Sequence, residues 1–470
     1  MKELATLAFS LFLMSTATAQ DFPGYRTSNN TGVNGVFFNP ANIADNRYRW
    51  DFTLFNVSTT IGNNRASFKI KDIGRTWDGD SLKNKIFSEG DGPSSGYVSA
   101  VVTGPSVFFN LGKKSALALT TRARVLSNII DIDGKLAKQL INDANDNIGL
   151  PYTISSTNNM VVNANAWTEF GVSYARTIMD KGHHFLKGGI SLKYLAGSAN
   201  TSININGLKG TIALDAVRND AYLTNSSGQI RLGFGGINIS EFESDDWLSF
   251  ESTGFGADIG FVYEYRPDTP DAGHNNLGEL RRDMNKYKFR VGLSLLDVGS
   301  IKYDRDVSRS GGYRINIAAN QRFYLSSLAD IDDYRDTLNK YPQFFTPDGT
   351  ASTASYSVAL PTTLQADIDY HLKNGFYVNL ATQLALTNSK TKVYNSQYYN
   401  SVTLTPRLEG RAIGVYVPMT YNALTQFTAG ASFRVGPLFF GSGSILSAAL
   451  GSSKQADAFI GFHFGGLQKK

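Results

Sequence analysis

The chain of 470 residues has no cysteine, which excludes disulfide bonds, thiolate metal sites and the acyl anchor of a lipoprotein. It also lacks long apolar runs: beyond its extreme N-terminus, no stretch of about 20 apolar residues could form a membrane-spanning helix. Charged residues are scarce, at 18% of the chain against about 25% in soluble proteins. In their place stand 45 Gly, 30 Phe and 23 Tyr. This composition is typical of outer-membrane β-barrels, which alternate apolar with polar residues.

Signatures of catalysis and of nucleic-acid binding are missing as well. The net charge is only +5, from 45 basic and 40 acidic residues without clustering, so we predict no nucleic-acid partner. Neither H-E-x-x-H nor G-x-S-x-G occurs. His183 and His184 are adjacent, and neighbours on a strand point to opposite faces, so a shared metal ion is not expected. The sequence therefore predicts neither an enzyme nor a bound cofactor.

The first residues have the pattern of a secretory signal peptide. Lys2 gives a basic start, residues 4–14 form an apolar core too short to span a bilayer, and residues 17–19 (ATA) form a cleavage site before Gln20. We therefore predict that residues 1–19 are removed and that the mature chain resides in the bacterial outer membrane.

Most of the remaining chain alternates between apolar and polar residues. In residues 287–295 the odd positions are aromatic or aliphatic, and the even positions are Lys, Arg, Gly and Ser. The same alternation occurs in residues 186–194, 255–265, 364–370 and 456–464. Runs of about 9–11 residues suit tilted strands that cross a bilayer, whereas strands of soluble sandwiches average about 5–6 residues. The pattern predicts an all-β, transmembrane antiparallel barrel of about fourteen to sixteen strands.

Four polar stretches interrupt this pattern, at residues 71–95, 127–159, 266–286 and 326–355. The periplasmic turns of such barrels are short, so we predict that all four are extracellular loops. No repeat of fixed period and no linker divides the chain. The predicted organisation is a signal peptide over residues 1–19, an N-terminal lead and hatch over 20–46, and the outer-membrane barrel over 47–470.

The segment just before the first predicted strand, residues 35–44 (GVFFNPANIA), is apolar and then turns abruptly. Pro40 has no N–H to donate and keeps Asn39 out of the helical region, so the segment does not pair as a strand. We predict a hatch inside the barrel, with Phe37 and Phe38 packed in the lumen and Asn39, Pro40 and Ala41 forming its turn. Displacement of this hatch would open a path through the barrel.

The polar side of the predicted strands directs a set of charged residues toward the lumen. They could line a path, or they could form salt-bridge networks that hold the hatch; we favour the structural role. The candidates are Arg122, Arg124, Glu169, Asp258, Glu264, Lys288, Arg290, Asp367 and Asp369.

Residues 35–44 resemble the N-terminal turn of the FadL-type transporters and the related PorV-like barrels, with Asn39, Pro40 and Ala41 at the matching positions. The chain is also similar, over nearly all of its mature length, to an uncharacterised family of Bacteroidota outer-membrane barrels, most clearly in residues 35–44 followed by 47–51, in 414–421 and in 436–443. The resemblance implies a barrel of about fourteen strands with its N-terminal segment inside the lumen. It implies no activity, because a fold does not fix a function.

Two functions stay open. The first is a FadL-like conduit for a hydrophobic or small molecule, gated by the hatch, with outer-membrane lipids and a small lipophilic ligand as partners. The second is a structural, PorV-like docking barrel for a Bacteroidota surface or type IX secretion system, with a periplasmic or surface protein as partner. A surface enzyme would need a nucleophile with a base in reach, and the sequence shows no such signature. We favour the conduit, because the hatch gives it a mechanism.

Overall fold

The structure is a computed structural model that describes residues 22–70, 92–134, 136, 150–237, 251–267, 285–328, 334–349 and 354–467. The predicted signal peptide lies outside these residues. Within the described ranges, no helix is long and apolar enough to cross a membrane, a finding that does not bear on crossing by β-strands.

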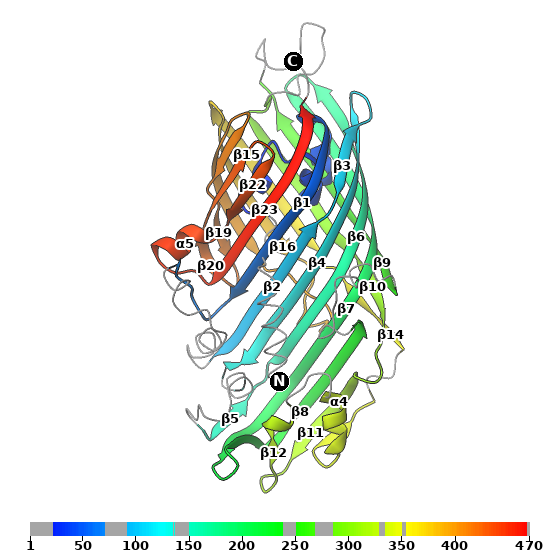
Figure 1. The fold of residues 1–470 in the computed structure, drawn as a ribbon, viewed down its shortest axis with the longest axis vertical. Helices are drawn as coiled ribbons and strands as arrows, with labels where there is room; N and C mark the ends of the chain where they lie inside the picture. Colours follow the sequence, from blue (N-terminus) through cyan, green and yellow to red (C-terminus); the bar gives the residue numbers. More distant parts are fainter. Residues whose placement is uncertain are drawn as a thin grey trace.

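The chain forms one antiparallel sheet that closes into a barrel of 14 strands, as the sequence predicts (Figure 1). Closure occurs where the first strand pairs with the last, for example Phe52 with Phe464. In order around the barrel, the strands are β1 (Tyr48–Asn63), β2 (Pro93–Thr103) continued by β3 (Ser106–Asn110), β4 (Ser115–Asp133), β6 (Asn159–Lys181), β7 (His184–Asp215), β9 (Ser252–Tyr265), β10 (Phe289–Asp304), β15 (Thr363–Lys373), β16 (Phe376–Ala385), β17 (Ser401–Glu409), β18 (Ile413–Tyr416) with β19 (Met419–Asn422), β20 (Gln426–Ala429) with β21 (Ala431–Val435), β22 (Leu438–Ser442) and β23 (Gln455–Leu467).

The outer face of the barrel carries the apolar residues of the alternating strands. Leu192 is 61% exposed, Ile368 53% and Leu293 49%. Many aliphatic and aromatic neighbours on other strands are exposed to a similar degree, among them Leu119, Val172, Ile259, Phe261, Leu380, Leu404, Phe433 and Ile460. An apolar surface that continues around the barrel is the surface that an outer-membrane barrel presents to lipid. The predicted alternation is therefore confirmed.

The two ends of the barrel differ. At one end, which we name the turn rim, short turns join β6 to β7, β15 to β16 and β21 to β22. The C-terminal end of β23 lies at the same rim, at the top of Figure 1. At the opposite end, the loop rim, most connections are longer, and among the described residues only β19 and β20 are joined there by a short turn, residues 423–425. Short turns mark the periplasmic end of outer-membrane barrels, so the loop rim faces the outside.

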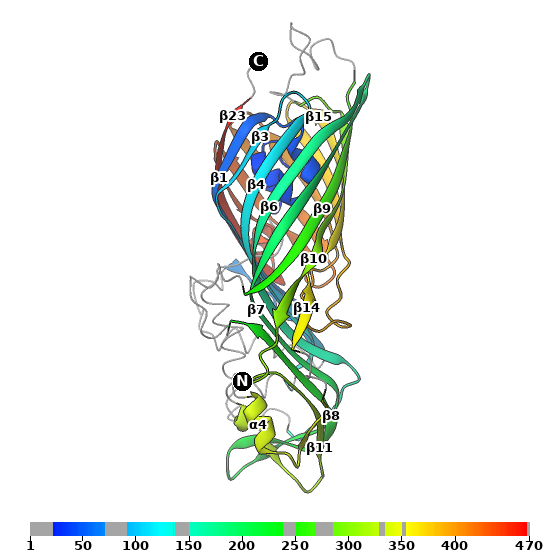
Figure 2. The same ribbon diagram turned by 90° about the vertical axis from the view of Figure 1, so that its right-hand side faces the viewer.

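The long strands β6 and β7 extend beyond the loop rim and carry a lobe, which lies at the bottom of Figures 1 and 2. The lobe has a hydrophobic core of its own, in which Leu232, Phe323 and Leu338 are almost fully buried. Its elements are β5 (Tyr152–Ser155), β8 (Asp220–Gly236), β11 (Gly311–Ile317), β12 (Phe323–Tyr324), η7 (Leu325–Leu328), α4 (Tyr334–Lys340) and β13 (Phe345–Pro347). Two other elements, β14 (Ser355–Ala359) and α5 (Ile445–Leu450), precede β15 and β23.

The predicted loops need correction. The ends of β9 and β10 lie at the turn rim, because Tyr265 pairs with both His184 and Phe289. The stretch 266–286 therefore starts and ends at the periplasmic rim, which contradicts the predicted extracellular loop, and its residues 268–284 lie outside the described residues. Of the other three, much of 71–95 lies outside the described residues. The stretches 127–159 and 326–355 are partly regular structure, because they contribute strand and helix residues to β4, to β6 and to the lobe. Strand residues beyond the bilayer have no apolar outer face, and this hid them from the sequence pattern.

Candidate functional site

The N-terminal segment, residues 22–46, lies inside the barrel near the turn rim (Figure 2). It is built of three short 3₁₀ helices: η1 (Tyr25–Thr27), η2 (Gly32–Phe37) and η3 (Pro40–Ile43). Helix η3 packs against β6, β7 and β9, and η2 packs against β1. Val33, Ala41 and Ile43 have no exposed surface. The segment fills the lumen and does not pair with the strands of the wall.

Asn39 attaches the segment to the barrel wall. Its side-chain oxygen accepts a hydrogen bond from the backbone N–H of Ala41 (3.0 Å), which caps η3. Its side-chain NH₂ donates to the carbonyl oxygens of Phe261 in β9 (3.1 Å) and Leu293 in β10 (3.2 Å). One side chain thus shapes the predicted turn and binds it to two adjacent strands.

Glycines in the wall let the backbone of this turn approach closely. A Cβ atom added at Gly189 would lie 2.5 Å from the carbonyl carbon of Pro40 and 2.6 Å from the nitrogen of Ala41. A Cβ atom at Gly260 would overlap the side chain of Asn39. The wall therefore has a recess without side chains where the turn fits. Glycine within a strand often marks such a close approach of another backbone.

Aromatic residues hold the other part of the segment. The ring of Phe22 meets Phe38 and Phe439 edge-on, at centroid distances of 6.3 and 5.4 Å. Tyr25 stacks on Phe439 at 3.9 Å, and its hydroxyl lies 3.0 Å from Nε2 of His463. Phe38 is buried in this cluster.

Six buried charged residues meet beneath the segment and form what we name the central charge layer: Arg122 and Arg124 of β4, Glu169 of β6, Lys193 of β7, Asp258 of β9 and Asp297 of β10. Glu169 accepts hydrogen bonds from Arg122 (2.8 Å), Arg124 (2.7 Å) and the indole of Trp167 (2.8 Å). Lys193 Nζ lies 2.8 Å from Asp258 and 2.6 Å from Asp297. The three positive and three negative charges balance, so the layer carries no net charge, and each of its members has an ion-pair partner.

Residues 387–400, between β16 and β17, fold back into the lumen on the other side of this layer. We name them the inner loop. They cross the barrel to β4, β6 and β7, where Asn128 and Asn163 donate to the carbonyl oxygens of Gln397 (3.0 Å) and Asn395 (2.9 Å). Gln397 N–H donates back to Asn128 (2.8 Å). The inner loop therefore fills the extracellular half of the lumen as the N-terminal segment fills the periplasmic half.

The central charge layer touches both fillers. The guanidinium of Arg122 lies 4.7 Å from the ring centroid of Phe37 in the N-terminal segment. Arg124 donates to the hydroxyl of Tyr398 in the inner loop (2.7 Å). Val36 and Phe37 line a narrow cavity against the layer. From periplasm to outside, the lumen thus holds the segment, the charge layer and the inner loop in series.

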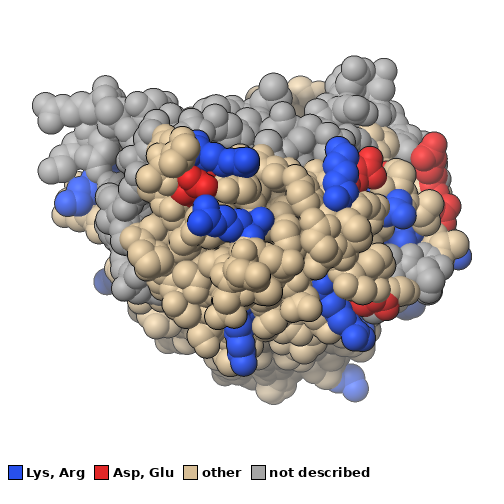
Figure 3. All heavy atoms as spheres, turned by 90° about the horizontal axis from the view of Figure 1, so that it is seen from below, with Lys and Arg blue, Asp and Glu red and all other residues tan. Residues whose placement is uncertain are grey.

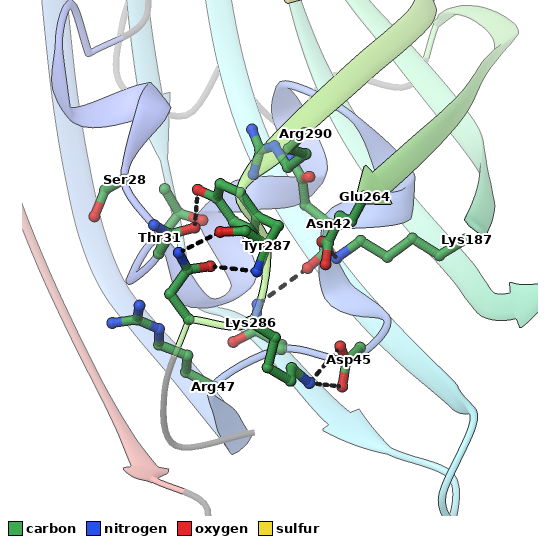
Figure 4. A pocket seen from close by; sticks show the side chains of 13 residues that line it. Ser28, Thr31, Asn42, Asp45, Arg47, Lys187, Glu264, Lys286, Tyr287 and Arg290 are labelled. Atoms are coloured by element: carbon green, nitrogen blue, oxygen red, sulfur yellow. Dashed lines mark hydrogen bonds and ion pairs between the residues drawn. The ribbon is translucent and has the colours of Figure 1, made fainter. Parts of the chain in front are cut away.

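A second charged group, the entrance cluster, fixes the end of the N-terminal segment to the turn rim. It consists of Asp45, Lys187, Glu264, Arg266 and Lys286. Lys286 Nζ lies 2.8 Å and Arg266 2.7 Å from the Asp45 carboxylate. Burial opposes ionisation of Asp45, but these two cations outweigh it and hold the pKa of Asp45 below its usual value. Figure 4 shows Asp45 and Lys286 beside an open pocket.

Asp45→Asn should loosen the N-terminal segment at pH 7 by about 1.5–3 kcal/mol, the range for hydrogen bonds to charged groups. Because the pKa is lowered when the segment is docked, the carboxylate stabilises docking above the free pKa near 3.9 and loses this effect as pH falls. Hydrogen exchange of residues 22–46 should be faster in the variant at pH 7, and the difference should narrow at pH 3. Equal exchange at pH 7 would show that Asp45 does not hold the segment.

A third charged group lies farther around the wall, on β10, β15 and β17. Asp369 accepts a hydrogen bond from Arg407 Nη2 (2.7 Å), and Arg407 Nε lies 3.6 Å from Glu409. The backbone N–H of Asn29 donates to Glu409 (3.2 Å), which ties this group to the N-terminal segment. Arg290 lies 3.3 Å from Asp367 on the adjacent strand. These charges hold the segment to the wall.

The structure brings most of the predicted lumen charges together, but into separate groups. Arg122, Arg124, Glu169 and Asp258 share the central layer, Glu264 lies in the entrance cluster, and the third group holds Arg290, Asp367 and Asp369. Lys288 lies outside the lumen: its Nζ is 4.8 Å from the ring centroid of Tyr370, which is 43% exposed on the outer face. The reason is that β10 begins only at Phe289, so the alternation does not extend to Lys288, and Tyr287 points inward.

Several members of these groups were missed. Lys187 and Lys193 occupy the polar, inward-facing positions of the alternation in residues 186–194, so the alternation could have identified them. Asp297 lies at a bulge of β10 with a φ of 59°, which shifts the alternation. Arg407 and Glu409 occupy a strand with only a weak pattern. Among the described residues, no group of three His, Asp or Glu side chains could hold a metal ion.

Comparison with solved structures gives transmembrane barrels of low similarity. The toluene transporter TbuX of Ralstonia pickettii matches with a TM-score of 0.39 and 11% identity, over 96% of this chain and 97% of that chain. A FadL homologue of Pseudomonas aeruginosa matches with a TM-score of 0.41 and 9% identity, over 95% and 94%. The translocator domain of the autotransporter NalP from Neisseria meningitidis has a TM-score of 0.29 and 9% identity, over 88% of both chains.

A search of the curated proteins gave no match. A family model, described as a family of unknown function (DUF5723), matches residues 40–443. This range contains the turn at Asn39-Pro40 from its proline onward and nearly the whole barrel. The chain therefore belongs to this family of unknown function, DUF5723.

Proposed function

We propose that the protein is a gated outer-membrane conduit in its closed state, with the N-terminal segment and the inner loop as two gates in series. One observation carries this proposal: neither filler contributes a strand to the barrel wall. Both could leave the lumen without breaking a strand ladder. A barrel of this strand number has an interior wider than the eight-stranded barrels that side chains fill completely, so removing the fillers would leave an aqueous path.

The lining of the lumen favours a small polar solute over a lipophilic one. The central charge layer lies on the path, and the wall around the inner loop presents buried amides and hydroxyls, including Asn128, Asn163, Asn200 and Ser202. A lipophilic molecule would have to desolvate these groups without replacing their hydrogen bonds. Of the two ligand classes that the sequence left open, the polar one agrees better with this lining.

The test is conductance in planar bilayers. One variant replaces residues 36–44 with a Gly/Ser linker of the same length, a second replaces the inner loop with a short turn, and a third carries both changes. Because the gates lie in series, each single variant should stay near the wild-type conductance. The double variant should conduct on the scale of an unobstructed wide barrel.

A control variant replaces the exposed lobe turn 216–219 with Gly/Ser and should conduct like the wild type. Folding of every variant is checked by its heat-modifiable migration in gels. A correctly folded double variant that stays closed would refute the conduit. A single variant that conducts as strongly as the double would refute the second gate.

A second candidate function is docking of a surface partner by the lobe. The lobe projects beyond the loop rim, and Figure 3 shows Lys and Arg side chains spread over this end with fewer Asp and Glu. Exposed basic residues of the lobe include Lys209, Arg218, Arg231, Arg314 and Lys340. Purification of the tagged protein from its own outer membrane should then recover a stoichiometric acidic partner that a charge-reversed lobe loses. A barrel that purifies alone would count against docking.

A further inference from the structure

The pocket beside the entrance cluster has no assigned role. Among the described residues it is open at the turn rim, and its cavity of about 50 Å³ lies between the N-terminal segment and the wall. Asn42 and Asp45 come from the segment, and Lys187 and Arg290 come from β7 and β10 (Figure 4). Arg47 follows the segment directly and borders the same pocket. Any group bound here would therefore contact the segment and the wall at once.

The lining of this pocket has an excess of positive charge. Four cations, Arg47, Lys187, Lys286 and Arg290, face two anions, Asp45 and Glu264, so the lining carries a formal charge of +2. The anions are shared, because Arg266 binds both of them as well. The next carboxylate outward, Asp367, compensates one charge through Arg290. Arg266 and the neighbouring group of Arg407, Asp369 and Glu409 belong to the same balance, because Asp369 acts on Arg290 and Glu409 on Arg47. Counted together, six cations face five anions, so one positive charge remains uncompensated.

Two arginines have donors to spare. With the described residues, Arg47 makes only a long hydrogen bond of 3.4 Å to the side-chain oxygen of Asn30 and no ion pair. Nε of Arg290 is buried without a hydrogen-bond partner among the described residues. A buried guanidinium N–H without an acceptor is costly, and an oxygen in the pocket would satisfy it. Arginine binds phosphate and carboxylate oxygens with two parallel hydrogen bonds.

We propose that this pocket binds a small oxyanion of the phosphate or carboxylate class, held by Arg47, Lys187 and Arg290. The anion bridges the N-terminal segment and the wall, so it stabilises the docked segment by mass action. Its access is from the turn rim, the periplasmic side. This site goes beyond the proposed conduit and does not depend on it, because a barrel that never opens would bind the anion equally well.

The experiment is a calorimetric titration of the full chain in detergent with inorganic phosphate at constant ionic strength. Acetate is titrated in parallel, to separate phosphate from a simple carboxylate. Wild-type protein should bind one of them saturably with one site per chain. Arg47→Gln should weaken this binding about tenfold, which corresponds to about 1.4 kcal/mol. Lys187→Gln, which keeps a donor for the carbonyl of Ala44, should weaken it as well.

The matched control is Arg49→Gln, the same change two residues along the chain, where the side chain is exposed. It should bind like the wild type. Absence of saturable binding to both anions would overturn the proposal, as would equal effects of Arg47→Gln and Arg49→Gln. If the wild type bound the anion and the double variant of the conductance test did not conduct, the anion site would stand and the conduit would be rejected. The two proposals can therefore fail separately.

Discussion

Replacing Glu169 by leucine should lower the stability of the barrel by about 3–5 kcal/mol, the cost of removing one partner from a buried ion pair. Glu169 is 3% exposed and accepts hydrogen bonds from three donors, those of Arg122, Arg124 and Trp167. Its loss leaves the central charge layer with three cations and two anions in a lumen closed on both sides. Asp297 lies 2.9 Å from Arg124 and 3.7 Å from Arg122 and would still pair with both. It also shares Lys193 with Asp258, so the two anions leave one positive charge uncompensated.

The stability is measured by urea unfolding in lipid vesicles, followed by tryptophan fluorescence. Asp180→Leu is the matched control, because Asp180 is an exposed carboxylate at the end of the same strand, β6. It should change the midpoint little. Glu169→Gln should lie between the two, since it keeps the shape and some hydrogen bonds but not the charge. If Glu169→Leu were as stable as Asp180→Leu, the layer would not hold the barrel together.

The barrel wall could be predicted from sequence because lipid imposes a simple rule on it. Where a strand crosses the bilayer, every second side chain must be apolar, and Leu192, Ile259 and Ile368 follow that rule on three different strands. The rule stops at the edge of the bilayer. The end of β4 and the lobe elements β5, α4 and β13 lie beyond it, in the stretches 127–159 and 326–355 that the sequence predicts as loops.

The residues that fill the lumen were predictable only where the alternation of inward and outward side chains is regular. Arg122, Arg124 and Glu169 were found as inward charges, but their partner Asp297 lies at a bulge that parity cannot see. The inner loop gave no signal, because polar segments that fold inward and polar segments that extend into solvent have the same composition. What distinguishes them is the set of asparagines on β4, β6 and β7 that receive the loop, and that pairing exists only in three dimensions.

The chemistry of Asn39-Pro40 predicts a turn inside the barrel, but the sequence does not reveal the recess in the wall that receives it. Glycine at positions 189 and 260 reads in the sequence as a weak strand residue. In the structure, these glycines allow the N-terminal segment to lie directly against the strand backbone. The fit of the segment therefore requires that positions 189 and 260 carry no Cβ atom. A small addition at this contact should therefore have a large effect.

Gly189→Ala should undock the N-terminal segment at a cost of about 1–3 kcal/mol, the range for overpacking a close contact. The added Cβ would lie 2.5–2.7 Å from three backbone atoms of Pro40 and Ala41, and backbone cannot rotate away as a side chain can. Hydrogen exchange of residues 22–46 should accelerate, while exchange in the strands β9 and β10 stays slow. If the segment stays protected, it does not depend on this recess.

Gly188→Ala is the control, because the same substitution at the next residue points to the other face of β7. There the added Cβ would meet the ends of side chains, Ile178 and Phe261, which can shift on the lipid-facing surface. Alanine also lowers the conformational entropy of the unfolded chain, so this variant should be as stable as the wild type or slightly more stable. A difference between the two variants then measures the contact of the wall with the N-terminal segment, separated from the general effect of replacing a strand glycine.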